Sequence, residues 1–208
     1  MTRAAFLDRD GVINLDRAYV HRWEDFEFVP GALDAMLRLA NAGYRLVIVT
    51  NQSGIARGYF SEAQYFELTR RMLAAFEDRG IRVAGVYHCP HHPSGIVDQF
   101  AVGCDCRKPA PGMILRAAAE HGLSLGDSIL IGDKPSDIAT ARAAGVARAF
   151  LVRSDNEEST VEPGDADGLF DSLADCADQL LVGGLHDAHD CMHSTDMASH
   201  AGRPARRQ

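Results

Sequence analysis

The chain has 208 residues, of which 46% are hydrophobic and 24% charged, and its formal net charge at pH 7 is −8. These values are typical of a globular protein with one substantial core, and the acidic balance argues against nucleic acids or an anionic membrane as partners. No run of 18 or more apolar residues predicts a transmembrane helix, and the N-terminus has no signal-peptide pattern. We therefore expect a cytoplasmic monomer whose five cysteines are reduced or metal-bound.

The first predicted strand is the apolar run of residues 4–7, which leads directly into Asp8, Asp10 and Gly11. Side chains two residues apart on a strand face the same way, so the two carboxylates can share one pocket. That pocket lies at the C-terminal end of the strand, where open parallel sheets bind their ligands. Clustered carboxylates repel each other unless a cation or a shared proton compensates them. The pair alone leaves a divalent-metal site and a solvated strand-end turn equally open.

Residues 14–28 have no clear hydrophobic period and predict a loop over this strand end, which is either a plain surface connection or a substrate-contacting flap. A helix is predicted at residues 30–41, since apolar residues recur there at intervals of three and four. The apolar run 44–50 then predicts a strand that is buried on both faces of a parallel sheet. The hydroxyl and amide groups that follow this strand suit phosphate oxygens: Thr50, Asn51, Gln52 and Ser53.

The rest of the chain continues to alternate helices and strands. Helices are predicted at residues 61–78, 111–121 and 169–181 and in the stretch that ends at residue 144, and strands at 83–88, 127–132 and 147–152. This alternation predicts an α/β fold with a doubly wound parallel sheet in one domain, residues 1–182. The tail, residues 183–208, has no periodic apolar pattern, so we expect it to be disordered or loosely packed. A metal site in this tail is the alternative, with the candidate ligands His186, His189, Cys191 and His193.

Four metal-binding side chains fall within eighteen residues of one another: Cys89, His91, Cys104 and Cys106. Three thiolates and one imidazole match a closed tetrahedral zinc site, which normally makes a loop rigid. His91 is preferred to His92, since ligation by two adjacent residues would be strained, and a disulfide is the weaker interpretation in the cytoplasm. A structural zinc in residues 89–106 would position Arg107 and Lys108. The acidic charge disfavours a zinc ribbon that binds nucleic acid.

Four further signatures occur in order along residues 4–152: Asp8-x-Asp10, Thr50 at the end of an apolar strand, Lys108-Pro109 and Gly132-Asp133-x-x-x-Asp137. Together they resemble the haloacid dehalogenase superfamily of phosphatases. The resemblance implies that Asp8 is the nucleophile, which forms an aspartyl-phosphate, and that Asp10 is the general acid and then the base. It also implies that Mg²⁺ binds to Asp8, Asp133 and the Asp10 backbone carbonyl. Asp137 would support that site, and Thr50 and Lys108 would hold the phosphoryl oxygens.

Within the superfamily, the zinc loop, a minimal cap and the Cys-Arg-Lys-Pro stretch resemble a branch that contains heptose bisphosphate phosphatases and histidinol-phosphate phosphatases. The loop 51–58 and the long interval between His91 and Cys104 favour the heptose enzymes. The implied reaction is Mg²⁺-dependent removal of the C7 phosphate of D-glycero-D-manno-heptose 1,7-bisphosphate, for lipopolysaccharide core or a related glycan. Histidinol-phosphate hydrolysis and a non-catalytic, zinc-stabilised interaction module are the alternatives. The implied contacts of the phosphorylated sugar are Asp16, Arg17, Ala18, Tyr19, Asn51, Gln52, Ser53, Arg107 and Lys134.

Overall fold

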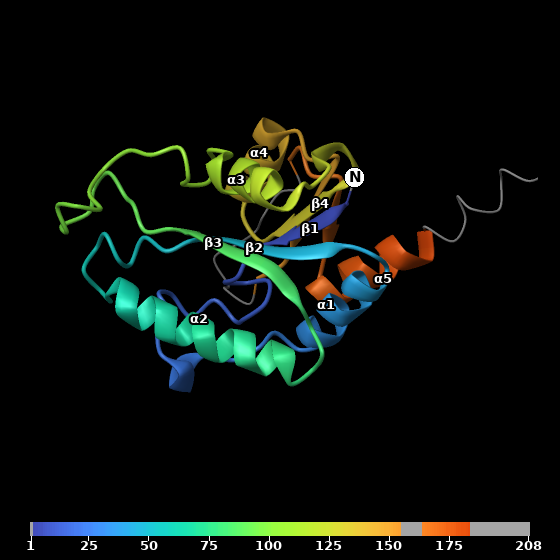
Figure 1. The fold of residues 1–208 in the computed structure, drawn as a ribbon, viewed down its shortest axis with the longest axis horizontal. Coiled ribbons are helices and arrows are strands. Elements are labelled where there is room, and N and C mark those ends of the chain that lie inside the picture. The colour runs from blue at the N-terminus through green and yellow to red at the C-terminus, as the bar shows by residue number, and fades with distance from the viewer. Residues whose placement is uncertain (1, 155–163, 184–208) are drawn as a thin grey trace, which may run out of the picture.

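The computed structural model describes residues 2–154 and 164–183. Six parallel strands form one sheet in the order β3-β2-β1-β4-β5-β6 (Figure 1). Their bounds are β1 Ala4–Leu7, β2 Arg45–Asn51, β3 Val83–Cys89, β4 Ile129–Gly132, β5 Arg148–Val152 and β6 Gly168–Phe170. The predicted parallel sheet is confirmed. The candidate metal ligands of the predicted tail, with nearly all of the tail itself, lie outside the described residues.

Helices cover both faces of the sheet (Figure 1). They are α1 Ala32–Asn41, α2 Glu62–Glu77, α3 Gly112–His121, α4 Pro135–Ala144 and α5 Leu173–Gly183. α1, α2 and α5 pack on one face, and α3 and α4 pack on the other. The sheet is therefore doubly wound, as the alternation of strands and helices predicts, and each face carries a buried apolar layer.

The elements begin and end where their sequences predict in most places. All four residues of β1 are buried, as are Leu46 to Val49 of β2, which explains why both strands are continuous apolar runs. α2 begins with a capping box. The hydroxyl of Ser61 accepts from the backbone N–H of Gln64 at 3.2 Å, and the side-chain oxygen of Gln64 accepts from the backbone N–H of Ser61 at 2.9 Å.

The last predicted helix, residues 169–181, begins later than expected. Gly168–Phe170 form the edge strand β6 instead, because they pair in parallel with Phe150–Val152 of β5. The hydroxyl of Ser172 then accepts from the backbone N–H of Asp175 at 3.2 Å, and this cap makes α5 begin at Leu173. Pairing with a neighbouring strand has overridden the helical pattern at this position.

Two smaller differences are short 3-10 turns. Leu125–Asp127 form one, so the strand predicted at 127–132 begins only at Ile129. Trp23–Asp25 form another inside the loop predicted at 14–28, and the ring of Trp23 stacks on Phe26 with centroids 5.3 Å apart. Neither turn changes the strand order.

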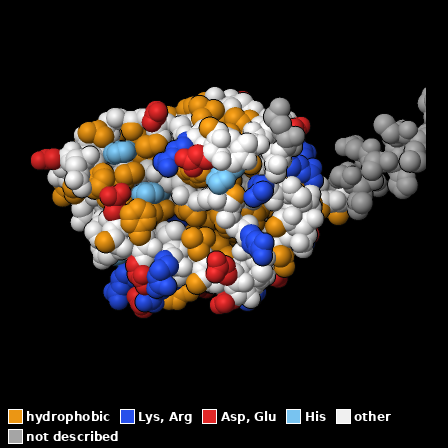
Figure 2. Space-filling view, viewed as in Figure 1, with side chains coloured by type: hydrophobic (Ala, Val, Ile, Leu, Met, Phe, Trp, Pro, Cys, Tyr) orange, Lys and Arg blue, Asp and Glu red, His pale blue; other side chains and the backbone are white. Residues whose placement is uncertain are grey.

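The surface mixes charged and apolar side chains. On the face shown in Figure 2, acidic and basic residues are interspersed, and the described residues form no extended basic patch there. No helix in residues 2–154 or 164–183 is both long and apolar enough to cross a membrane.

The strand order brings the predicted site residues together. β1 lies between β2 and β4, and Leu7 is level with Ile48 in one neighbour and with Ile131 in the other. The C-terminal ends of the three strands therefore meet at one edge of the sheet. Asp8, Thr50 and Asp133 lie at that edge.

Candidate active site

Asp8 lies buried directly after β1, at the centre of the candidate site. Its Oδ2 is 2.9 Å from Nζ of Lys108, which is also 2.5 Å from Oδ1 of Asp137 and donates to the carbonyl of Val49 at 3.2 Å. Burial raises the pKa of Asp8 to about 6, although the charge of Lys108 opposes this effect. Burial would lower the pKa of Lys108, but Asp137 and Asp8 raise it, so its ammonium stays charged. A buried carboxylate with a fixed cation beside it suits an incoming phosphoryl group.

Three buried carboxylates, those of Asp8, Asp133 and Asp137, offer oxygens that all lie within 4.8 Å of one another. Burial and the neighbouring charge of Asp8 raise the pKa of Asp133 to about 8. Within the described part of the chain, Oδ1 of Asp133 has no hydrogen-bond partner. Clustered acids with a free oxygen fit a hard divalent cation such as Mg²⁺, which prefers oxygen ligands. The structure thus brings together the side chains that were predicted to bind magnesium.

The backbone of Asp10 and Gly11 packs against Asp133. Gly11 has a φ of +87°, and a Cβ added to it would lie only 2.4 Å from Oδ2 of Asp133. Glycine alone tolerates both this conformation and this close approach. The main chain that carries the Asp10 carbonyl therefore lies beside the carboxylate cluster, where it would add an oxygen ligand for a divalent cation.

Magnesium is expected to stabilise the protein more at high pH than at low pH. The folded-state pKa values of Asp8 and Asp133, about 6 and about 8 without metal, lie above the ordinary aspartate value. The stability that these two groups contribute is therefore complete below about pH 4 and is lost as the pH rises through 6 and then 8. A bound cation needs the ionised forms and reverses that loss. We expect Mg²⁺ to raise Tm by on the order of 5 °C at pH 8.5 and by much less at pH 5.5.

Differential scanning calorimetry of the metal-free protein, with and without Mg²⁺ at both pH values, measures this difference. Asp133→Asn is the matched variant, in which the rise at pH 8.5 should disappear. Equal rises at the two pH values would contradict the assignment of the buried carboxylates as magnesium ligands.

The carboxylate of Asp10 is not part of the cluster of Asp8, Asp133 and Asp137, and its own set of donors holds it. β1 ends at Leu7, and strand alternation no longer governs residue 10. The carboxylate of Asp10 accepts from Asn14 Nδ2 at 3.0 Å and from Gln52 Nε2 at 3.0 Å, and it pairs with Arg9 at 2.9 Å. Burial would raise the pKa of Asp10, but the charge and hydrogen bonds of Arg9 lower it below its ordinary value.

Arg9 is a buried residue beside the site that the sequence analysis did not predict. Its side chain is only 1% exposed, and it also donates to the carbonyl of Val20 at 2.9 Å. Its place directly between two acids at the end of an apolar run was the available signal, but that position alone does not predict burial.

The end of β2 and the loop after it supply the predicted hydroxyl and amide groups. Thr50 is buried, and its hydroxyl accepts from Gln52 Nε2 at 2.8 Å. Asn51 holds the backbone of Lys108 from both sides: its Oδ1 accepts from the Lys108 N–H and its Nδ2 donates to the Lys108 carbonyl, both at 3.1 Å. The position of Lys108 therefore depends on β2 as well as on its own loop.

A cleft of about 410 Å³ opens at this edge of the sheet. Most of the predicted catalytic and substrate residues line it: Asp10, Asp16, Ala18, Tyr19, Asn51, Gln52, Ser53, Arg107, Lys108 and Lys134. Gly54 and Ser136 complete the lining and were not predicted. Arg17 does not line the cleft, because its side chain forms an exposed ion pair with Glu27.

One wall of the cleft is the segment from Asp16 to Tyr19. Asp16 pairs with Nζ of Lys134 at 3.0 Å and accepts from the backbone N–H of Ala18 at 3.1 Å. Ala18 and Tyr19 have φ values of 54° and 55°, and this left-handed conformation costs a non-glycine residue about 1 kcal/mol or more. Strain of this kind persists where the surroundings impose it, often at ligand-binding sites. The segment therefore fits a substrate-contacting flap better than a plain surface connection.

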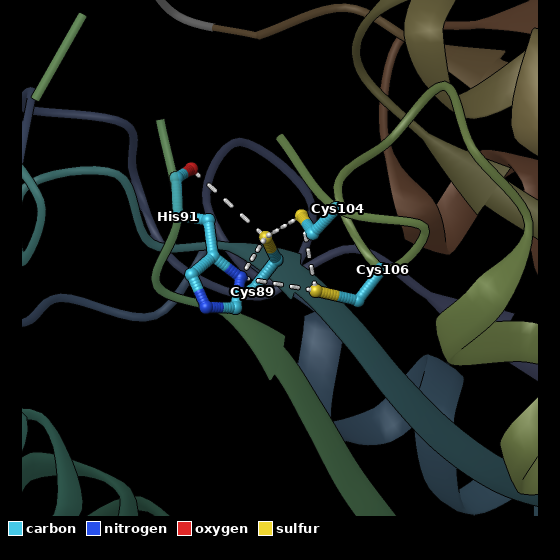
Figure 3. A group of neighbouring side chains, drawn as sticks. All are labelled: Cys89, His91, Cys104 and Cys106. Atoms are coloured by element: carbon cyan, nitrogen blue, oxygen red, sulfur yellow. Dashed lines mark hydrogen bonds between the residues drawn. The ribbon is translucent and has the colours of Figure 1, made fainter. Parts of the chain in front are cut away.

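Cys89, His91, Cys104 and Cys106 converge on one point (Figure 3). Sγ of Cys104 lies 3.5 Å from Sγ of Cys89 and 3.3 Å from Sγ of Cys106. Nδ1 of His91 lies 3.4 Å and 3.7 Å from the sulfurs of Cys106 and Cys89. A tetrahedron with Zn–S bonds of about 2.3 Å has edges of about 3.8 Å, so these four atoms fit a zinc ion. His92 instead lies 3.0 Å from Nη2 of Arg57.

The loop that carries this cluster is tied to the cleft. The backbone N–H of Gln52 donates to the carbonyl of Cys89 at 2.8 Å, and that of Ala56 donates to the carbonyl of Pro90 at 3.2 Å. The guanidinium of Arg107 donates to the carbonyl of His91 at 3.3 Å. The loop that carries the cluster is therefore hydrogen-bonded to two residues of the cleft lining, Gln52 and Arg107.

Comparison with known proteins adds independent findings. The profile of a family described as HAD-hydrolase-like matches residues 105–176. The chain is 48% identical over 172 residues to the D-glycero-beta-D-manno-heptose-1,7-bisphosphate 7-phosphatase of Escherichia coli (strain K12), covering 83% of this chain and 90% of that protein. It is 45% identical over 178 residues to the protein of the same name from Vibrio cholerae serotype O1, covering 86% and 96%.

A solved structure is similar as well. It is the D,D-heptose 1,7-bisphosphate phosphatase from B. bronchiseptica, complexed with magnesium and phosphate. The TM-score is 0.73 at 33% identity, and the match covers 88% of this chain and 99% of that one.

Proposed function

The chain belongs to the haloacid dehalogenase superfamily and, within it, to the family of the heptose bisphosphate phosphatases, and from this membership we propose that it removes the C7 phosphate of D-glycero-β-D-manno-heptose 1,7-bisphosphate. The observation that carries the proposal is the buried carboxylate of Asp8, 2.9 Å from Nζ of Lys108 beside a cleft lined by the predicted substrate residues. The product would serve as a heptose precursor for lipopolysaccharide core or a related glycan.

In the first step, an oxygen of Asp8 attacks the phosphorus of the C7 phosphate, and the bond from phosphorus to the sugar oxygen breaks. Asp10 donates a proton to that oxygen, so the sugar leaves as an alcohol and the phosphoryl group stays on Asp8 as an aspartyl-phosphate. Lys108 and Thr50 hold the phosphoryl oxygens. Magnesium, held by Asp8, Asp133 and the Asp10 carbonyl, would supply positive charge against the phosphoryl group.

In the second step, Asp10 is a carboxylate and takes a proton from water, whose oxygen attacks the phosphorus. The bond from phosphorus to Asp8 breaks, inorganic phosphate leaves, and the Asp8 carboxylate is restored. Burial would raise the pKa of Asp10, but Arg9 lowers it. Arg9 therefore favours the ionised state from which this step begins.

The second phosphate of the substrate fits the basic side chains of the cleft. The guanidinium fork of Arg107 matches a phosphate bidentately, and Lys134 adds a second charge nearby. A chain with a net charge of −8 needs such local attraction for an anionic substrate. Ser53 is neutral where an amine-bearing substrate such as histidinol phosphate would favour an acid, so it supports the sugar.

We also propose that Cys89, His91, Cys104 and Cys106 bind a structural zinc ion. A closed set of three thiolates and an imidazole leaves no open position for substrate. Thiolates of this kind persist in a reducing compartment, which supports a cytoplasmic protein. The prediction of a monomer is kept, and size-exclusion chromatography with light scattering tests it.

A substrate comparison tests the proposed function. We expect kcat/KM for the β anomer of heptose 1,7-bisphosphate to exceed that for the α anomer, and to exceed that for histidinol phosphate by on the order of 10²-fold or more. Steady-state phosphate release from the three compounds in the presence of Mg²⁺ measures these ratios. A preference for histidinol phosphate would overturn the proposal. A folded, zinc-loaded protein without any phosphatase activity would instead favour the interaction module.

A further inference from the structure

The carboxylate of Asp10 is held by a fixed set of donors whose centre is the guanidinium of Arg9. Nη2 of Arg9 lies 2.9 Å from both oxygens of Asp10, and Nε lies 3.3 Å from Oδ1. Gln52 donates to Oδ2 of the same carboxylate at 3.0 Å, and Asn14 donates to Oδ1 at 3.0 Å. Contacts from several directions fix the rotation of the carboxylate, which a single opposite charge would leave free.

The guanidinium of Arg9 also contacts the chain just after the flap, Gln52 of the cleft lining and the ring of Tyr65. Nη2 donates to the carbonyl of Val20, just after the strained flap, at 2.9 Å and lies 3.4 Å from Oε1 of Gln52. The ring of Tyr65, on α2, lies with its centroid 5.9 Å from Cζ of Arg9. Through Arg9, the orientation of Asp10 therefore depends on Val20, Gln52 and Tyr65.

The burial of Arg9 indicates which group its charge acts on. Its side chain is 1% exposed, and a buried guanidinium is costly unless it is paired and hydrogen-bonded. Nε and Nη2 meet this need, whereas Nη1 has no partner among the described residues. In the described ranges, Asp10 is the one acid that forms an ion pair with Arg9. Arg9 is also not among the residues that line the cleft. The buried charge of Arg9 therefore acts on the carboxylate of Asp10.

We infer that Arg9 is a positioning residue for proton transfer: it holds the carboxylate of Asp10 in the orientation from which Asp10 protonates the leaving oxygen and then activates water. This inference rests on the proposed function, because both steps belong to the proposed phosphatase reaction. Arg9 itself makes and breaks no bond in either step.

Two substrates with different leaving groups distinguish this role from a general loss of structure. A sugar alkoxide needs the proton of Asp10, whereas p-nitrophenolate leaves without one. In Arg9→Gln, we expect the first step on the sugar phosphate to slow by on the order of 10²-fold, and the first-turnover release of nitrophenolate to slow by less than about threefold. Because the second step still needs the base, nitrophenyl phosphate should give a burst of one nitrophenolate per active site. Acid-quenched Arg9→Gln should then carry the phosphoryl group.

Rapid-quench and stopped-flow measurements on both substrates give the two first-step rates. Arg38→Gln is the matched control, since Arg38 is an arginine on α1 that pairs with Asp178 and does not line the cleft. It should keep the wild-type ratio of the rates. Equal slowing of both first steps in Arg9→Gln would show that Arg9 has a structural role only and would overturn the inference.

A second variant guards against misfolding. Arg9→Lys keeps the buried charge but loses the planar fork, so it should also slow the sugar phosphate selectively. An unchanged ratio of rates in Arg9→Lys, when Arg9→Gln does not fold, would likewise overturn the inference. If the wild type hydrolyses nitrophenyl phosphate but not the heptose bisphosphate, the proposed substrate is wrong. The ratio of the two first-step rates is then measured with another sugar phosphate that the wild type hydrolyses.

Discussion

Asp8→Asn is expected to abolish turnover, lowering kcat by on the order of 10⁵-fold or more, because an amide cannot form the aspartyl-phosphate bond. The fold should survive this change. Lys108 keeps its ion pair with Asp137 at 2.5 Å, and the loss of one of three clustered carboxylates removes repulsion. Steady-state phosphate release and a thermal unfolding curve on the same preparation measure both effects.

Asp178→Asn is the matched control for this experiment. Asp178 is a half-exposed acid on α5 that pairs with Arg38, so its replacement should leave kcat unchanged. Mass spectrometry after acid quenching adds a direct readout, since the wild type should gain one phosphoryl group during turnover and Asp8→Asn should gain none. Retention of more than a hundredth of wild-type activity by Asp8→Asn would refute its assignment as the nucleophile.

Cys104→Ser is expected to release the zinc ion and to lower Tm by more than about 10 °C, because structural zinc contributes on the order of 10 kcal/mol to folding in small zinc modules. Activity should fall with it. The loop is tied to the cleft through the carbonyls of Cys89 and His91, which accept from Gln52 and Arg107. Metal analysis by plasma mass spectrometry, thermal unfolding and phosphate release together test this prediction.

Cys176→Ser provides the comparison for a cysteine outside the cluster. Cys176 is a buried free thiol on α5, and its replacement should leave one zinc ion per chain. Full zinc occupancy in Cys104→Ser would show that the ligand set is wrong. Loss of zinc without any fall in Tm would show that the metal does not stabilise the fold.

Much of the site could be predicted because its residues lie where strands end. Continuous apolar runs predict strands buried on both faces, and parallel strands place their C-terminal ends at one edge. Once the strands are located, this rule predicts that Asp8, Thr50 and Asp133 lie together at that edge. The Cys/His cluster could be predicted for a different reason, since thiolates and an imidazole close together in sequence are readily brought around one ion.

The remaining features depend on contacts between distant segments. The orientation of Asp10 is set by Gln52 from the end of β2 and by Arg9, whose own position depends on Val20. Arg17 was predicted to contact substrate, but it pairs with Glu27 on the surface. β6 forms because β5 presents an open edge, and a local helical pattern carries no information about that edge.

The place of β1 in the sheet also affects how the protein is made. Among the described strands, β1 comes earliest in the sequence, yet it lies between β2 and β4. Asp8 therefore leaves the ribosome long before Asp133, and long-range parallel pairing is slow because the intervening chain must close first. A nascent chain that ends before β4 contains Asp8 but lacks Asp133. The cluster of Asp8, Asp133 and Asp137 therefore forms only when β4 docks beside β1.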